Sequence, residues 1–344
     1  MIPQLQTFLA QKSRCLLRTI FVFFLLCLQT SPSKASPDLS SDTVLRNHLW
    51  HDLLAEPKGQ RPMVGLALSA GGTRAASHIG VISVLEEMGF PIDIVAGTSM
   101  GAIIGSFYAA GKTPEDLKKL ILKVKVEDVS NFGMLSLLRY VFSQKLFSSK
   151  KLATLIQKEI GNQRFENLPK PFACVSMDIN SGEAIIFREG RIAPAVRASM
   201  NLPGVFKPVQ YRQRYLVDGA VVDYVPVDAA RLLGAKWVLA SVTEDDYTRA
   251  KPKNVLSTLQ QVIDIRGAFI SEEEKKFANF VIQPSVGNVP SVGGASVYMT
   301  PTPAIVDRGV LAATEQITKA KESYILFSMP SLAQNYLPSK KAQN

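Results

Sequence analysis

Apolar residues fill two short runs in the first third of the chain, and each run is followed by a glycine-containing turn and a helical pattern. The first run, residues 64–69, leads into a helix that ends near Gly89. The second run, residues 91–96, leads into a helix expected over residues 102–110. Uninterrupted apolar runs of this length are typical of strands buried on both faces. Two successive strand–turn–helix units predict an α/β fold with a mainly parallel central sheet flanked by helices.

The apolar pattern predicts further elements downstream. We expect helices at residues 114–124, 149–160, 194–200, 255–280 and 304–327, and strands at 172–177, 184–187, 236–242 and 281–282. An apolar stripe at residues 132–142 indicates core packing first, with a lid or membrane-docking surface as the alternative. Residues 284–303, rich in proline, glycine and serine, receive no assignment.

The first 35 residues have the three parts of an export signal. A basic region ends at Arg18, an apolar run follows from Ile20 to Leu28, and small residues at Ser33 and Ala35 suit cleavage after position 35. The apolar run is much shorter than the roughly 20 residues that a membrane-spanning helix needs. We therefore predict an exported protein of the periplasm, the cell envelope or the medium, with an uncleaved anchor as the alternative.

Composition divides the rest of the chain into segments, and the number of cysteines limits its disulfide and metal chemistry. We expect a polar linker at 36–62 with a short amphipathic stretch around 44–54, one domain at 63–328 whose motif-bearing core is 64–242, and a C-terminal tail at 329–344. Removal of the signal leaves Cys174 as the remaining cysteine, which excludes an intrachain disulfide and a cysteine metal cluster. We expect a buried thiol there, and no metal or cofactor.

The net charge and the distribution of Lys and Arg indicate which kind of binding partner to expect. The chain has 39 Lys and Arg against 29 acids, and loss of Lys12, Arg14, Arg18 and Lys34 with the signal leaves 35 against 29, a modest net charge of +6 that favours anionic lipid surfaces or nucleic acid. Lys and Arg do not cluster among aromatic residues, so we expect lipids and not nucleic acid as partners.

The sequence Gly97-Thr98-Ser99-Met100-Gly101 lies between the second predicted strand and its helix. A serine between small residues at a strand-to-helix turn is typical of a nucleophile elbow, where the strained turn exposes the hydroxyl. The pattern alone occurs by chance, but its position between strand and helix makes Ser99 the candidate nucleophile.

A serine nucleophile needs a base, and histidine is the usual one in hydrolases with this elbow. The three histidines, His48, His51 and His78, all precede Ser99, so the usual order of serine, acid and histidine is excluded. A carboxylate, a lysine or His78 in an unusual order remain. The favoured base is Asp218, which ends an apolar strand and precedes Gly219.

The other candidates have less support. Asp223 is the fallback, and His78 is expected to be a packed, hydrogen-bonded core residue. Because a free aspartate has a pKa near 3.9, burial must raise the pKa of Asp218 if that carboxyl is to act as a base.

A glycine loop, Ala70-Gly71-Gly72-Thr73-Arg74, joins the first strand to its helix. Amides in such a loop can hold a phosphate or the oxyanion of an acyl-transfer intermediate. The nucleotide patterns G-x-G-x-x-G and G-x-x-x-x-G-K-[ST] are absent here, so we predict an oxyanion hole formed by residues 71–74. Arg74 is expected either to pin the loop or to contact a phosphate.

Together these motifs resemble the patatin-like phospholipase family. The similarity covers about residues 64–327 and rests on the loop, the elbow, Asp218-Gly219-Ala220, His78-Ile79-Gly80-Val81, Val196-Arg197-Ala198-Ser199-Met200 and Pro203-Gly204-Val205-Phe206-Lys207-Pro208. It implies a three-layer α/β fold, a dyad of Ser99 and Asp218, and calcium-independent hydrolysis of acyl esters in phospholipids or neutral glycerides.

Two departures from the family pattern affect the loop. Ala70 and Ala75 stand where the family usually has glycine, which puts the shape of the oxyanion hole in question. The predicted function is therefore a serine lipid acyl hydrolase. The alternatives are a lipid acyltransferase and a catalytically impaired lipid-binding protein of the envelope.

Overall fold

A computed structural model describes residues 41–123, 148–243, 255–286 and 302–336. The chain divides after Leu49 into two units, residues 1–49 and 50–344, and the sheet and the candidate site belong to the second unit. The predicted export signal at 1–35 and the apolar stripe at 132–142 lie outside the described residues.

The second unit is built on an eight-stranded sheet with the order β5-β6-β3-β2-β1-β7-β8, and β4 pairs with β3 outside this path. The strands are β1 (Val64–Leu68), β2 (Ile94–Thr98), β3 (Phe172–Asp178), β4 (Ala184–Phe187), β5 (Val209–Tyr211), β6 (Arg214–Asp218), β7 (Trp237–Ser241) and β8 (Phe280–Ile282). The path β3-β2-β1-β7-β8 is parallel, whereas β4 and β6 pair antiparallel with β3 and β5 pairs antiparallel with β6. The predicted mixed α/β class is confirmed, and one side of the sheet is antiparallel.

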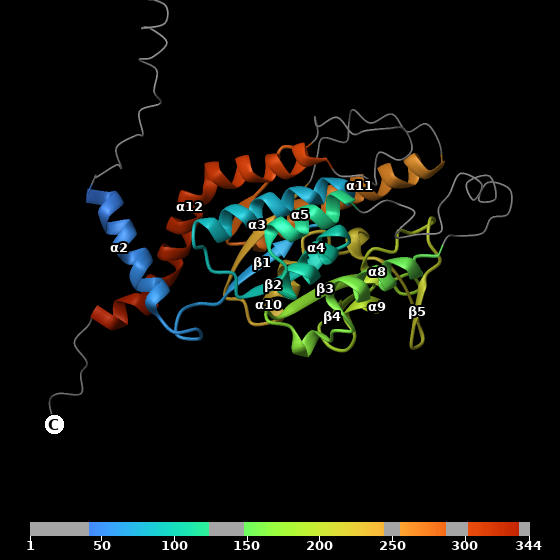
Figure 1. Ribbon diagram of the computed structural model, residues 1–344, viewed down its shortest axis with the longest axis horizontal. Helices are drawn as coiled ribbons and strands as arrows, with labels where there is room; N and C mark the ends of the chain where they lie inside the picture. Colours follow the sequence, from blue (N-terminus) through green and yellow to red (C-terminus); the bar gives the residue numbers. More distant parts are fainter. Residues whose placement is uncertain (1–40, 124–147, 244–254, 287–301, 337–344) are drawn as a thin grey trace, which may run out of the picture. The chain divides into compact units, whose positions relative to one another are not determined.

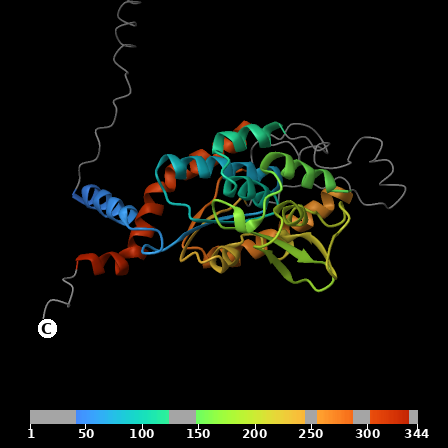
Figure 2. The same ribbon diagram turned by 60° about the horizontal axis from the view of Figure 1, so that its bottom comes forward.

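Helices cover both faces of the sheet (Figures 1 and 2). They are α3 (Ser77–Glu87), α4 (Met100–Ala109), α5 (Pro114–Lys123), α8 (Lys150–Ile160), α9 (Ile192–Ser199), α10 (Val227–Leu232), α11 (Val255–Glu274) and α12 (Pro303–Tyr336). Gly105 of α4 lies against Leu68 and Val95, while Gly65 of β1 faces the opposite way, toward Ala230 of α10. Strands β1, β2 and β7 are wholly buried between these layers, which explains their continuous apolar sequences.

Several element boundaries differ from the predicted ones. A helix, α2 (Ser41–Ala55), lies within the segment predicted as a linker. Helix α11 ends at Glu274 and is followed by a short 3-10 turn, η5 (Lys275–Phe277), before β8. Helix α12 continues to Tyr336, beyond the predicted end at residue 327. None of the described helices has an apolar stretch long enough to cross a bilayer.

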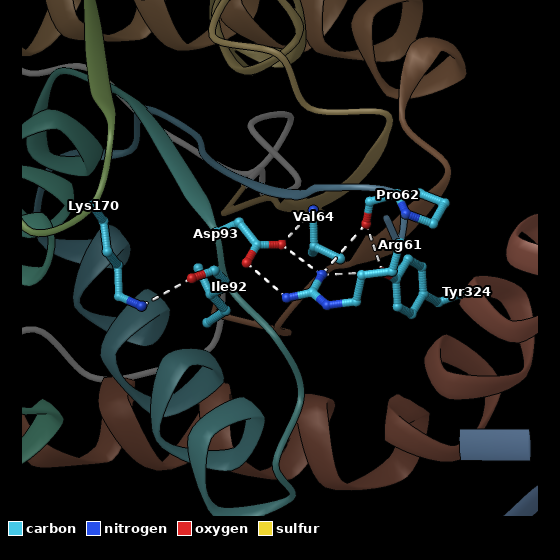
Figure 3. Close-up of polar contacts among 7 residues, drawn as sticks. All are labelled: Arg61, Pro62, Val64, Ile92, Asp93, Lys170 and Tyr324. Carbon is cyan, nitrogen blue, oxygen red and sulfur yellow. Dashed lines mark hydrogen bonds and ion pairs between the residues drawn. The ribbon is translucent and has the colours of Figure 1, made fainter. Parts of the chain in front are cut away.

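A buried polar cluster connects helix α12 to the amino edge of the sheet, by which we mean the side where the parallel strands begin (Figure 3). The Arg61 guanidinium donates to both carboxylate oxygens of Asp93, at 2.7 and 2.8 Å, and to the Tyr324 hydroxyl of α12 at 3.2 Å. Tyr324 in turn donates to the Pro62 carbonyl at 2.6 Å, and the Val64 amide donates to Asp93 at 2.9 Å. The cluster thus joins the chain before β1, the start of β2 and α12.

Helices α3 and α12 also pack closely along their lengths. Gly80 of α3 lies against the backbone of Val306, and Gly309 of α12 lies against the backbone of Ser77. A side chain at either glycine would collide with the facing helix, which accounts for the glycine in the sequence His78-Ile79-Gly80-Val81.

Candidate active site

The pairing of the strands places the predicted nucleophile, Ser99, next to the predicted base, Asp218. Thr98, the last residue of β2, is paired with Val175 of β3, and the next residue of β3, Ser176, is paired with Asp218 at the end of β6. Ser99 follows Thr98 directly and therefore leaves the sheet next to the paired residues Ser176 and Asp218. The pairing brings together two residues that are 119 positions apart in the sequence.

Ser99 occupies the strained turn that the sequence predicts for a nucleophile elbow. Its backbone angles are φ 56° and ψ −123°, in a region that L-residues with side chains seldom adopt. The glycines on either side have no room for a side chain: Gly97 faces the backbone of Gly101, and Gly101 faces the carbonyls of Leu68 and Ser69. Small neighbours therefore let α4 start against the ends of β1 and β2.

The side chains of Ser99 and Asp218 form a direct hydrogen bond. Ser99 Oγ donates to Asp218 Oδ2 at 2.6 Å, and the Ala220 amide donates to Asp218 Oδ1 at 2.9 Å. Burial raises the pKa of Asp218 to about 7, although both hydrogen bonds act in the opposite direction. Gly219 lies against the Val175 carbonyl, so its lack of a side chain permits this close approach to β3. The arrangement provides a carboxyl group that changes protonation near neutral pH, in contact with a serine hydroxyl.

The glycine loop begins beside the elbow and opens the 3-10 helix η1 (Gly72–Ala76). Gly71 and Gly72 have φ of 150° and 55°, and a side chain at Gly71 would collide with Thr243. Among the described residues, no acceptor pairs with the backbone amides of Gly71, Gly72 or Thr73. The Arg74 amide, by contrast, donates to the Gly71 carbonyl at 3.1 Å. Three of the four predicted oxyanion amides therefore have no hydrogen-bond partner within the described part of the chain.

The Arg74 side chain lies away from these amides and fastens the loop to α11. Its Nη2 donates to Asp264 Oδ1 at 2.9 Å, and both side chains are mostly buried. This contact corresponds to the first of the two predicted roles for Arg74, pinning the loop.

The two alanines that depart from the family pattern fit the loop without strain. Within the described ranges, the non-glycine residues with positive φ are Ser99 and Arg212, so Ala70 and Ala75 do not occupy positions that require glycine. Ala70 belongs to the hydrophobic core, and its carbonyl accepts a hydrogen bond from the Thr243 hydroxyl at 2.7 Å. Neither alanine replaces a glycine that this loop conformation needs.

His78 is a buried structural residue, as the sequence predicts. Its Nε2 lies 3.0 Å from the Ser69 carbonyl and its Nδ1 lies 2.7 Å from Ser241 Oγ. A carbonyl can only accept, so Nε2 carries the hydrogen and Nδ1 accepts from the serine hydroxyl. Burial lowers the pKa of His78 to about 4, which keeps the ring neutral.

The fallback base Asp223 is engaged elsewhere. It shares a hydrogen bond with Glu274 of α11, and burial together with the neighbouring Asp228 raises the pKa of its carboxyl. Glu274 also accepts hydrogen bonds from the backbone amides of Tyr224 and Val225. This acidic group fixes the chain after the Asp218 motif to α11.

Two further residues contact the dyad and received no role from the sequence. Ser199 Oγ accepts a hydrogen bond from the Ser99 amide at 3.0 Å, and the Asn201 carbonyl accepts one from the Asp218 amide at 3.0 Å. The resemblance had pointed to the segment containing Ser199, but a serine near the end of a short helix carries no signal of this contact. In the described part of the chain, no group of three or more His, Cys, Asp or Glu side chains is arranged to hold a metal ion.

The protein is an α/β protein with a candidate serine–aspartate site. The site consists of a strained serine at the end of a parallel strand, a buried aspartate that is hydrogen-bonded to this serine, and a loop with unpaired backbone amides. Residues 66–231 match the family model described as patatin-like phospholipase. These residues, just under half of the chain, form a patatin-like phospholipase domain.

Known proteins resemble parts of this chain. An uncharacterized NTE family protein of Mycobacterium tuberculosis is 34% identical over 173 residues, which cover 48% of this chain and 45% of the relative. The lysophospholipase NTE1 of Meyerozyma guilliermondii is 32% identical over 177 residues, which cover 52% of this chain and 12% of the relative. The chain thus matches less than half the length of either relative. Among solved structures, VipD from Legionella pneumophila is 17% identical with a TM-score of 0.45, over 77% of this chain and 67% of VipD.

Proposed function

We propose that this protein hydrolyses carboxylic esters of phospholipids or acylglycerols through an acyl-enzyme on Ser99. The observation that carries the proposal is the 2.6 Å hydrogen bond from Ser99 Oγ to the buried carboxyl of Asp218. The match of residues 66–231 to the patatin-like phospholipase model and the name of the Meyerozyma guilliermondii relative, a lysophospholipase, support a lipid ester as the substrate.

The first half of the reaction acylates the serine. Asp218 Oδ2 takes the proton from Ser99 Oγ as that oxygen attacks the ester carbonyl, and the carbonyl oxygen becomes an oxyanion. Amides of Gly71 and Gly72, with that of Thr73, donate to this oxyanion. The carbon–oxygen bond to the alcohol then breaks, and the proton passes from Asp218 to the departing alcohol.

The second half returns the enzyme to its starting state. Water gives a proton to Asp218 while its oxygen attacks the acyl carbon, and the bond between Ser99 Oγ and the acyl group breaks. The proton returns from Asp218 to Ser99 Oγ, and the fatty acid leaves. Because the pKa of Asp218 is raised to about 7, the carboxylate form that accepts protons is lost as the pH falls below that value. We therefore expect kcat/KM to fall about tenfold per pH unit below about 7.

A fluorophosphonate probe and a lipid substrate together test the proposal. The wild-type protein should react with the probe at Ser99 and release fatty acid from phosphatidylcholine vesicles, and Ser99→Ala should do neither. Fatty acid release by Ser99→Ala at the wild-type rate contradicts the proposal. If the acyl group instead moves to an added alcohol with little free fatty acid formed, the protein is an acyltransferase.

A further inference from the structure

One short segment of the chain holds the backbone of both candidate dyad residues. Ser199, the last residue of α9, accepts a hydrogen bond from the Ser99 amide, and the carbonyl of Asn201 accepts one from the Asp218 amide, each at 3.0 Å. Ser199 and Asn201 are both fully buried. Two positions in one segment therefore fix the backbones on either side of the contact between Ser99 and Asp218.

The bond to Ser99 acts on a residue that needs support. Ser99 has φ 56° and ψ −123°, and such a conformation persists only where the surrounding structure holds it. Its amide is also one of the first amides of α4, which have no acceptor within the helix. Ser199 Oγ provides that acceptor and so fixes the turn in the orientation that directs Ser99 Oγ toward Asp218.

The segment itself is anchored by the Asn201 side chain. Asn201 Oδ1 accepts from the Ser149 hydroxyl at 2.7 Å, and Asn201 Nδ2 donates to the Lys207 carbonyl at 2.8 Å. Ser149 Oγ also accepts from Arg197 Nε of α9 at 3.0 Å. These bonds connect α9, the start of α8 and the chain beyond the turn, so the segment cannot shift without breaking several of them.

We propose that Ser199 and Asn201 form a positioning clamp that sets the distance between Ser99 Oγ and the Asp218 carboxyl. Neither residue takes part in bond making, and each acts through the backbone of one dyad member. The inference rests on the proposed function, because it assigns the clamp to the acylation of Ser99.

The rate of fluorophosphonate reaction with Ser99 tests the clamp. In Ser199→Ala the Ser99 amide loses its acceptor, and we expect the reaction to slow by roughly ten- to a hundredfold, the loss typical of a small misplacement of reacting atoms. With a 4-nitrophenyl fatty acid ester, kcat should fall by a similar factor while KM stays within about twofold. Ser106→Ala is the matched control, because Ser106 is equally buried but its hydroxyl donates to Ile103 within α4 and contacts neither dyad residue.

The pH profile separates positioning from a general loss of stability. The hydrogen bond from Ser99 lowers the pKa of Asp218 against the effect of burial, so weakening that bond should raise the pKa. The inflection in kcat/KM should therefore move to higher pH in Ser199→Ala and remain in place in Ser106→Ala. A loss of folded protein lowers the amplitude of the profile without moving its inflection.

Each outcome decides between the two proposals. A folded wild-type protein that does not react at Ser99 overturns the proposed function and the clamp with it. A reactive wild type together with a Ser199→Ala variant as fast as Ser106→Ala overturns the clamp alone. If Ser199→Ala does not fold, Ser199→Cys retains a side chain of similar size with a weak acceptor, and a wild-type reaction rate in that variant also overturns the clamp.

Discussion

Two buried aspartates lie near opposite edges of the same sheet, and their carboxyl groups have opposite surroundings. Asp93 precedes β2 at the amino edge and contacts the Arg61 guanidinium through both oxygens. Asp218 is the last residue of β6 and lies near the carboxyl edge, the side where the parallel strands end. Its described partners there are neutral donors, the Ser99 hydroxyl and the Ala220 amide. Strand β2 spans the two environments, since Asp93 comes directly before it and Ser99 directly after it.

The difference in partners determines the charge of each carboxyl. Burial by itself raises the pKa of Asp93, but hydrogen bonds from Arg61 and from the Val64 amide outweigh it and hold that pKa below its ordinary value. Burial raises the pKa of Asp218 to about 7 because its hydrogen bonds come from uncharged groups. Burial alone therefore does not distinguish a structural aspartate from a candidate base; the presence of a fixed cation does.

Removing the carboxylate of Asp218 should have the largest effect. We expect Asp218→Asn to lower kcat by about a thousandfold, because a general base typically contributes between about 10²- and 10⁴-fold. The amide can still accept the Ala220 hydrogen bond, so the protein should remain folded by circular dichroism. Steady-state hydrolysis of a 4-nitrophenyl fatty acid ester gives kcat. An Asp218→Asn variant with kcat within tenfold of wild type would show that another group is the base.

The sequence predicted most of the features near Ser99 because they are local. A strand, a glycine turn and a helix follow one another along the chain, and the order of the histidines excluded the usual base by counting. Asp218 was predicted as the base because it ends an apolar strand and precedes a glycine, and the family resemblance implied the same pair of Ser99 and Asp218; the geometry is compatible with both. Its catalytic role stays a prediction until it is measured.

Features that depend on distant segments could not be predicted. Asp93 lay inside a predicted strand, and nothing local indicated that Arg61, 32 residues earlier, would neutralise it. Tyr324 joins the same cluster from 263 residues beyond Arg61, and Ser199 reaches Ser99 across 100 residues. Periodicity identifies a strand or a helix, but strand order and helix docking decide which polar side chains meet.

The ion pair at the amino edge should contribute stability without affecting catalysis. Arg61→Met leaves the Asp93 carboxylate buried without its cation, and loss of one partner of a buried pair typically costs about 3–5 kcal/mol of unfolding free energy. Urea denaturation measures that loss, and kcat of the folded fraction should remain within about twofold of wild type. In the double variant Arg61→Met/Asp93→Asn the isolated charge is absent, so part of the stability should return. A double variant no more stable than Arg61→Met argues against a charge effect.

The two aspartates should also give opposite dependences of stability on pH. The folded pKa of Asp93 lies below its unfolded value, so its contribution is present above the unfolded pKa and is lost as the pH falls through the folded pKa. The folded pKa of Asp218 is about 7 against 3.8 for a free aspartate, so ionising Asp218 destabilises the folded protein increasingly between these values.

A stability comparison over pH measures this contrast. We expect Asp218→Asn to match wild type near pH 4 and to be more stable by on the order of 4 kcal/mol at pH 8. Denaturation at several pH values in one buffer series gives the difference. Equal stability of the two proteins at pH 8 would contradict the unfavourable burial of an ionised Asp218.

The smallest effect concerns the hydroxyl that connects the ion pair to α12. Tyr324→Phe removes the hydrogen bond donated to the Pro62 carbonyl and the one accepted from Arg61, while both bonds from Arg61 to Asp93 remain. We expect a loss of about 2 kcal/mol in unfolding free energy, about 1 kcal/mol for each of the two hydrogen bonds. Arg61→Met, measured in the same urea titration, should lose more, about 3–5 kcal/mol. If the two variants lose equal stability, the hydroxyl that docks α12 holds this edge of the sheet, and the charged pair adds little beyond keeping Asp93 ionised.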